Sequence, residues 1–145
     1  MSTLNIESPA VQSYVTILQA IISRMASNSA ACKTWCITLV SAILVIVADK
    51  GKPEYVWITM IPIVLFLFLD SYYLGLERFF REVYNTFINK LQSDKATIND
   101  VFTVGVDTSF KETITFIFRA LWSVSIWPFY GLLGLMLIII RVQIF

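Results

Sequence analysis

The sequence predicts an all-α integral membrane protein, with a transmembrane hairpin, a third kinked transmembrane helix and two amphipathic cytoplasmic helices. Hydrophobic residues make up 57% of its 145 residues and charged residues only 14%, which is too apolar for an ordinary soluble domain. Three apolar runs are separated by polar segments, and two stretches carry apolar residues at helical spacing. We therefore expect a cytoplasmic helix (residues 1–30), the hairpin (31–76), a cytoplasmic helix with a loop (73–111) and the third span (112–145).

The first two apolar runs form the hairpin. They cover residues 34–48 and 55–69, and the DKGKPE segment between them has the Gly and Pro of a tight turn. Each run has 15 residues, whereas a hydrocarbon core of about 30 Å asks for roughly 20 helical residues. Each run therefore borrows uncharged neighbours, with Lys33 snorkelling and Asp70 accepted near the inner boundary.

The third apolar run covers residues 120–140 between Arg119 and Arg141, and its 21 uncharged residues are enough to span a bilayer. Pro128 lies inside the run and removes a backbone donor, so we expect a kink there. A re-entrant or interfacial helix is the alternative, because Pro128 and the aromatic residues around it also suit that arrangement.

The placement of lysine and arginine predicts the orientation. Seven of these cations lie in the N-terminal part and in residues 70–111, whereas the hairpin turn holds only Lys50 and Lys52. The positive-inside rule then puts the N-terminus and the central segment in the cytoplasm and the turn outside, with the C-terminus outside after a third span. The first 34 residues lack the pattern of a secretory signal peptide, so we expect the N-terminus to be retained.

At Asp70 the second apolar run passes, without a stop signal, into an amphipathic helix. Its apolar residues recur at i, i+3, i+4 and i+7 with charges opposite. The stripe consists of Leu76, Phe79, Phe80, Val83, Tyr84, Phe87, Ile88 and Leu91. The opposite face offers the i, i+4 ion pairs Glu77–Arg81 and Arg78–Glu82. We take the stripe from Leu76 to Phe87, with Arg78 and Arg81, as the candidate assembly or partner surface.

The N-terminal helix is the second cytoplasmic element. Ser8 is placed to cap it, with Pro9 in the first turn. Its stripe consists of Val11, Tyr14, Val15, Leu18, Ile21, Ile22 and Met25. The two stripes share one compartment, so we expect them to pack on each other or on copies from neighbouring subunits. Lying flat on lipid headgroups is the competing arrangement, but the polar face of residues 77–90 is balanced rather than basic.

Residues 93–111 are rich in turn-type residues and predict a loop with one short strand. Within it, the TVG sequence of residues 103–105 resembles part of the potassium-channel filter, whose carbonyls replace an ion's hydration shell. The second glycine is missing, and a charged amphipathic segment stands where a pore helix should be. We therefore expect a plain loop.

The missing residue types restrict the chemistry. The chain has no histidine, which removes the usual nucleophilic triads and histidine metal sites. Cys32 and Cys36 lie one helical turn apart, awkward for a disulfide and too few for a structural zinc site, so we expect two small buried side chains. The glycines are scattered, so no phosphate cradle is visible. A net charge of +1 argues against nucleic-acid binding. We expect a protein that is not an enzyme and uses no cofactor or metal.

Asp70 and Arg119 are the ionisable residues nearest the membrane core. A carboxylate there should face protein or water, and Arg119 is its expected partner. Asp70 then either ends the hydrophobic zone or stands at the mouth of a pore between subunits. We take Asp70 and Arg119 as candidate pore or gating residues.

The segments ISRMASNSAACKTWCITLVSAILVIVADKGKP and FLDSYYLGLERFFREVYN resemble those of small bacterial membrane proteins found in defence and mobile islands. The layout of cytoplasmic helices around a transmembrane hairpin is similar to SLATT-type effectors and, more loosely, to small oligomeric membrane proteins of the RipA type. The resemblance covers about the first 90 residues. It implies an oligomer in the bacterial inner membrane that disrupts this membrane during phage infection, triggered by a cytoplasmic protein or a nucleotide signal.

Two functions of different classes remain open. The first is a homo-oligomeric membrane pore or channel-type effector, in which the spans line a pathway and the cytoplasmic helices control it. The second is a non-catalytic membrane anchor or sensor subunit that recruits a cytoplasmic partner. In both, the expected partners are the lipid bilayer and further copies of the chain.

Overall fold

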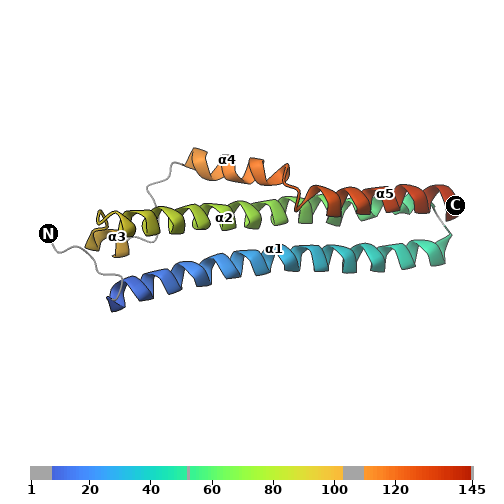
Figure 1. The fold of residues 1–145 in the computed structure, drawn as a ribbon. Coiled ribbons are helices and arrows are strands. Elements are labelled where there is room, and N and C mark those ends of the chain that lie inside the picture. Colours follow the sequence, from blue (N-terminus) through green and yellow to red (C-terminus); the bar gives the residue numbers. More distant parts are fainter. Residues whose placement is uncertain (1–7, 52, 103–109, 145) are drawn as a thin grey trace.

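Two long antiparallel helices, α1 (Pro9–Lys50) and α2 (Met60–Gln92), form the axis of a rod in the computed structural model, which describes residues 8–51, 53–102 and 110–144 (Figure 1). The helices α4 (Phe110–Leu121) and α5 (Trp127–Ile144) follow each other along this rod, and both lie beside α2 (Figure 1). Within the described ranges all regular structure is helical, as the all-α fold class predicts, and the short strand expected in residues 93–111 does not occur in the described part of that segment.

The helix α1 begins where the sequence predicts it. Ser8 is its N-cap, and the Ser8 hydroxyl accepts a hydrogen bond from the Val11 amide at 3.4 Å, with Pro9 as the first helical residue. The helix runs through residue 30 without a break and ends at Gly51, whose φ of 62° and N–H bond to the Ala48 carbonyl close the C-terminus. At 42 residues it is about 63 Å long, roughly twice the hydrocarbon thickness of a bilayer.

The hairpin returns through a 3₁₀ helix, η1 (Pro53–Thr59), into α2. Pro62 lies in the first turn of α2, where its missing N–H leaves no bond unmade. The helix then continues through Asp70 to Gln92, so the predicted continuous element is confirmed. Both α1 and the η1–α2 segment, Glu54–Gln92, are long and apolar enough to cross a membrane.

The core divides into two hydrophobic clusters along the rod. The turn-side half, residues 31–75 and 120–144, holds the first cluster. Its buried members include Cys36, Val40, Val47, Val56, Ile63, Ala120, Ile126, Tyr130 and Leu137. The distal half, residues 8–30, 76–102 and 110–119, holds the second. Its buried members are Val11, Tyr14, Leu18, Val83, Phe87, Leu91 and Ala96. The two amphipathic stripes therefore pack on each other within one chain, which confirms the first of the two packing arrangements expected.

The prediction of one kinked helix over residues 120–140 is wrong. The chain leaves α4 at Leu121 and begins α5 at Trp127, so the apolar run is divided between two helices with turns between them. Pro128 stands in the first turn of α5, where the helix needs no donor from it. The hydropathy of the sequence does not reveal this break, because the residues of the turn are uncharged like those of the helices on either side. The apolar part of α5, Trp127–Val142, is shorter than α1 and the η1–α2 segment, the two described helices that are long enough to cross a membrane.

The segment after α2 also differs from the prediction. A short helix, α3 (Ile98–Phe102), stands in the stretch predicted as a loop with one strand. Thr97 precedes it, and the Thr97 amide and hydroxyl both donate to the Asp100 carboxylate at 2.8 Å, an arrangement that closes a helix N-terminus. The TVG sequence of residues 103–105 lies outside the described residues.

Candidate functional site

Asp70 lies at the point where the two clusters meet, and its side chain is completely buried. A buried carboxylate costs several kcal/mol unless a charge and hydrogen bonds compensate it. The antiparallel packing of α1 against α2 supplies both, from one face of α1. The hairpin therefore supplies both the cation and the hydrogen bond that Asp70 receives.

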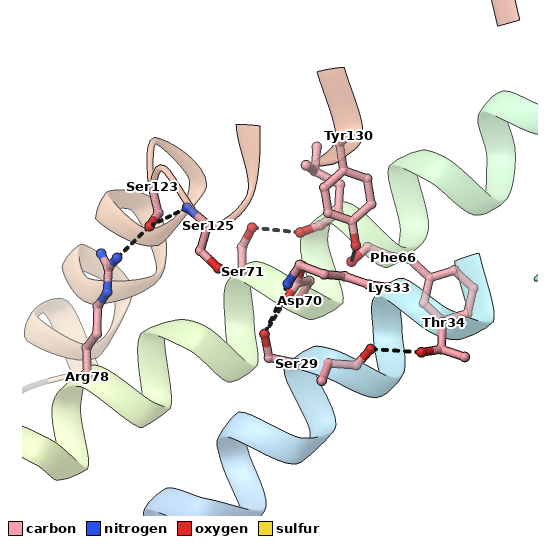
Figure 2. Close-up of polar contacts among 12 residues, drawn as sticks. Ser29, Lys33, Thr34, Phe66, Asp70, Ser71, Arg78, Ser123, Ser125 and Tyr130 are labelled. Atoms are coloured by element: carbon pink, nitrogen blue, oxygen red, sulfur yellow. Dashed lines mark hydrogen bonds and ion pairs between the residues drawn. The ribbon is translucent and has the colours of Figure 1, made fainter. Parts of the chain in front are cut away.

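Ser29 and Lys33 lie one turn apart on α1 and point toward Asp70 together (Figure 2). The Ser29 hydroxyl donates to Oδ1 of Asp70, and the Lys33 ammonium lies 2.6 Å from Oδ2. Lys33 also donates to the Ser29 hydroxyl at 3.4 Å. Oδ2 accepts no well-directed hydrogen bond from the described residues, so Lys33 holds it mainly by charge. The Lys33 side chain keeps 21% of its surface exposed, which lets its ammonium stay near solvent.

Hydroxyl groups around Asp70 bond to helix carbonyls. The Ser71 hydroxyl donates to the Leu67 carbonyl at 2.6 Å, and the Tyr130 hydroxyl of α5 donates to the Phe66 carbonyl at 3.0 Å (Figure 2). The bond from Tyr130 fixes α5 to α2 at the level of the ion pair. Cys32 and Cys36 are free and buried nearby, as predicted for two small core side chains.

The expected pairing of Asp70 with Arg119 is wrong. Arg119 is exposed on α4, and Lys33 takes its place beside Asp70. The carboxylate is enclosed and neutralised within one chain, so the structure does not present it to a surface. Sequence reasoning missed Lys33 as the partner, although a signal existed. Lys33 and Asp70 lie at nearly equal distances from Gly51, and such residues face each other in an antiparallel hairpin.

Arg78 of α2 binds the non-helical segment between α4 and α5, residues 122–126. Its guanidinium donates to the Ser123 hydroxyl at 2.5 Å, and the Ser125 amide donates to the same hydroxyl at 3.3 Å (Figure 2). One turn earlier, a Cβ at Gly75 would lie 3.0 Å from the backbone of Ile117. The predicted Arg78–Glu82 pair is therefore replaced by a bond that docks α4 on α2.

The predicted assembly surface is largely occupied inside the chain. Val83 and Phe87 are buried against α1, with the Phe87 ring 4.7 Å from the Tyr14 ring. The remaining apolar members of that surface are half-buried, and all but Leu76 pack against the second cluster. They are Leu76, Phe79, Phe80 and Tyr84. Arg81 remains exposed and pairs with Glu77 at 2.8 Å, as predicted. This leaves Arg81 as the most accessible of the proposed residues.

The outward face of α1 carries a second feature, which the sequence reading did not single out. We call it the hydroxyl stripe. It consists of Ser27, Thr34, Thr38 and Ser41, and all four are exposed. At about 100° per residue, Thr34, Thr38 and Ser41 lie roughly opposite the buried side chains of Cys36, Val40 and Val47. The Thr38 hydroxyl donates to the Thr34 carbonyl at 2.9 Å, so its oxygen keeps acceptor capacity on the surface.

Large apolar side chains cover the rest of the turn-side surface. Examples from α1, α2 and α5 are Val45, Ile46, Ile61, Phe68 and Ile138, which are between 57% and 70% exposed. Exposed tyrosines and tryptophans stand at two levels. Tyr55 and Trp57 are near the hairpin turn. Tyr72, Trp122, Trp127 and Trp35 are near the level of Asp70. The rise along η1 and α2 separates Tyr55 from Tyr72 by about 28 Å.

The described residues bring together no group of three or more cysteine, aspartate or glutamate side chains that could hold a metal ion. The site can instead hold two helices in register by a buried ion pair and present hydroxyl groups on an apolar surface. No family model, curated protein or solved structure matches this chain, so the functional assignment rests on this geometry.

Proposed function

We propose that the chain is a homo-oligomeric membrane protein of the pore or channel type, whose copies meet through α1. The hydroxyl stripe carries the proposal, since among the described residues its members Thr34, Thr38 and Ser41 form a row of exposed hydroxyl groups on a turn-side surface that is otherwise strongly apolar. Small and hydroxyl-bearing residues are the kind that let membrane helices approach one another. They are also able to hydrogen-bond water in a lumen.

The distribution of exposed side chains supports a membrane position. Exposed apolar residues on every helix of the turn-side half would be costly in water, and lipid removes that cost. The two levels of exposed tyrosine and tryptophan are about 28 Å apart, close to the roughly 30 Å of a hydrocarbon core with aromatic residues at its interfaces. The hairpin then crosses the membrane, and the distal half extends into the cytoplasm. This is the orientation that the cations favour.

A pathway would have to lie between copies. The first cluster fills the interior of the turn-side half of one chain, and the Asp70–Lys33 pair occupies the space between α1 and α2 where this half meets the distal half. Outside, Thr34, Thr38 and Ser41 form a row that neighbouring copies could place around a common axis. The Asp70 site then keeps the hairpin in register and does not touch the permeating ion. Antiphage defence as the setting is supported by the sequence resemblance alone.

Ion flux into liposomes tests the proposal. Purified wild type is compared with Thr34→Val/Thr38→Val, which removes two hydroxyls while keeping side-chain shape. The matched control is Thr16→Val, because Thr16 is exposed on the distal half of α1 and its hydroxyl donates to Gln12 in the same i−4 manner at 2.8 Å. We expect flux several-fold slower in the double variant and unchanged in the control. Equal flux in all three proteins would contradict the proposed channel. So would the absence of flux in wild type over a range of protein densities and nucleotide triggers.

Crosslinking between copies tests the assembly separately. In a Cys32→Ala/Cys36→Ala background, Ser41→Cys should give disulfide-linked dimers in membranes. Leu39→Cys, exposed on another face of α1, is the matched control and should give few. Equal crosslinking at both positions would contradict a copy interface on the hydroxyl stripe.

A specific observation also favours the anchor function. In the distal half, a groove of about 530 Å³ lies between α1 and α2 and offers polar side chains from both helices. Gln19, Ser23, Arg81, Tyr84 and Asn85 contribute to it. A cytoplasmic partner that binds here should be lost from pull-downs on Arg81→Glu and retained on Lys95→Glu. An unaffected pull-down would exclude this groove.

A further inference from the structure

An apolar groove follows the contact between α2 and α5. Two cavities of about 360 Å³ and 350 Å³ lie along this contact, and both are lined by Met60. The first reaches Trp57 and Arg141 beside the hairpin turn, and the second reaches Trp122 and Trp127 at the α4–α5 break. The groove therefore extends between the two levels of exposed aromatic residues.

Two glycines keep this groove open. Gly134 lines the first cavity and Gly131 the second, one turn apart on α5. A Cβ added at either position would have no atom within 4 Å. The glycines are therefore not needed for a close approach between helices in this chain. They leave room along α5 for a bound molecule or another chain.

Among the described residues, Arg141 is the one charged residue that lines either cavity. Its guanidinium carbon lies 4.9 Å from the centre of the Trp57 ring, so the indole helps to hold the charge at the end of the groove. Arg141 has no ion-pair partner among the residues that the structure describes. A cation at the end of an apolar groove is complementary to a ligand with an anionic head and a hydrocarbon tail.

We propose that the groove binds one phospholipid, with an acyl chain along Gly134 and Met60 and the phosphate at Arg141. The proposal rests on the membrane position argued above but not on a channel. The turn-side end of the groove then lies at the interface where lipid phosphates are found, and Trp57 stands at the same level. Gly134 and Arg141 are about 10 Å apart along α5, within the roughly 15 Å of one leaflet. The α1 face, on another side of the hairpin, is the one assigned to contacts between copies.

Native mass spectrometry of the full-length protein in detergent tests this. Delipidated wild type, titrated with dioleoylphosphatidylglycerol, should retain one lipid per chain. Gly134→Leu should abolish retention, because its Cβ meets no atom within 4 Å and the rest of its side chain occupies the space of the acyl chain. Arg141→Gln should weaken binding about tenfold or more, since it removes a charge-assisted hydrogen bond to phosphate. Matched controls are Leu135→Phe, which adds bulk to α5 away from the lining, and Lys50→Gln, which removes another cation near the turn.

Ile138→Phe narrows the same cavity and replaces Gly134→Leu if circular dichroism shows that variant unfolded. Retention of lipid by both groove-filling variants would overturn the proposal. The absence of retained lipid in wild type would also overturn it. If, in addition, Gly134→Leu changed only the mass of the oligomer, the groove would be assigned to contact with a second copy. Lipid binding without flux would refute the channel alone, whereas flux without lipid binding would refute the groove site alone.

Discussion

Lys33 Nζ lies 2.6 Å from Asp70 Oδ2, and these two charges join α1 to α2 where the apolar half of the rod meets its amphipathic half. The ion pair fixes the register of the hairpin. A shift of one turn in either helix would separate the charges and leave a carboxylate among apolar side chains. The pair therefore specifies the arrangement even where its net contribution to stability is small.

Removing one charge of this pair should cost far more than removing both. We expect Asp70→Leu to lower the free energy of unfolding in detergent by about 2 to 4 kcal/mol. This loss is smaller than the loss from breaking a fully buried ion pair, because the unpaired Lys33 ammonium is partly exposed and can reach solvent. Lys33→Met/Asp70→Leu should recover most of this loss. The measurement is equilibrium unfolding followed by circular dichroism.

Arg81→Met is the control for this cycle, because it breaks the exposed Arg81–Glu77 pair and should change stability by less than about 0.5 kcal/mol. A double variant no more stable than Asp70→Leu would show that Asp70 has a role independent of Lys33.

The sequence predicts the helical elements well because their signals are local. The Ser8 cap, the turn at Gly51 and the passage of α2 through Asp70 all follow from residues within a few positions of each other. The partner of Asp70 depends on register between helices far apart in sequence. Local sequence predicts that Lys33 snorkels and points to Arg119 only as a cation at the membrane edge.

The division of residues 120–140 was also beyond local reasoning. A run of uncharged residues predicts a span, yet here the helix breaks where Arg78 binds Ser123, and the preceding helix α4 packs on α2 where Gly75 leaves room for Ile117. Both contacts are tertiary. In contrast, α3 was predictable, since Thr97 and Asp100 have the spacing of a capping box.

Gly75 should be required for the docking of α4. In Gly75→Ala, the added Cβ would lie 3.0 Å from Cα and Cγ1 of Ile117 and 3.1 Å from its amide nitrogen, so backbone has to move. We expect a loss of about 1 to 3 kcal/mol in the free energy of unfolding, with faster hydrogen exchange in α4.

Gly131→Ala is the matched control, because a Cβ there meets no atom within 4 Å. It should be neutral or slightly stabilising, since alanine favours a helix more than glycine does. Equal effects at the two glycines would mean that helix propensity, and not the contact with Ile117, decides the result.

Asp100 should make the distal half sensitive to acid. The Lys90 ammonium, 2.8 Å from one carboxylate oxygen, and the amide and hydroxyl of Thr97 on the other lower the pKa of Asp100 from 3.8 to about 2. Because the folded-state pKa lies below the unfolded value, this stabilisation is present above about pH 4 and disappears as the pH falls toward 2. Asp100→Asn should therefore lower the free energy of unfolding by about 1 to 2 kcal/mol at pH 5, a value reduced for the solvent exposure of Lys90. The difference from wild type should shrink as the pH falls toward 2, because wild type then loses the same stabilisation.

Thermal unfolding in detergent between pH 5 and pH 2 measures the difference in stability. Asp94→Asn is the control, because Asp94 is exposed and has no ion pair among the described residues. A difference in stability between wild type and Asp100→Asn that stays constant down to pH 2 would contradict the lowered pKa of Asp100.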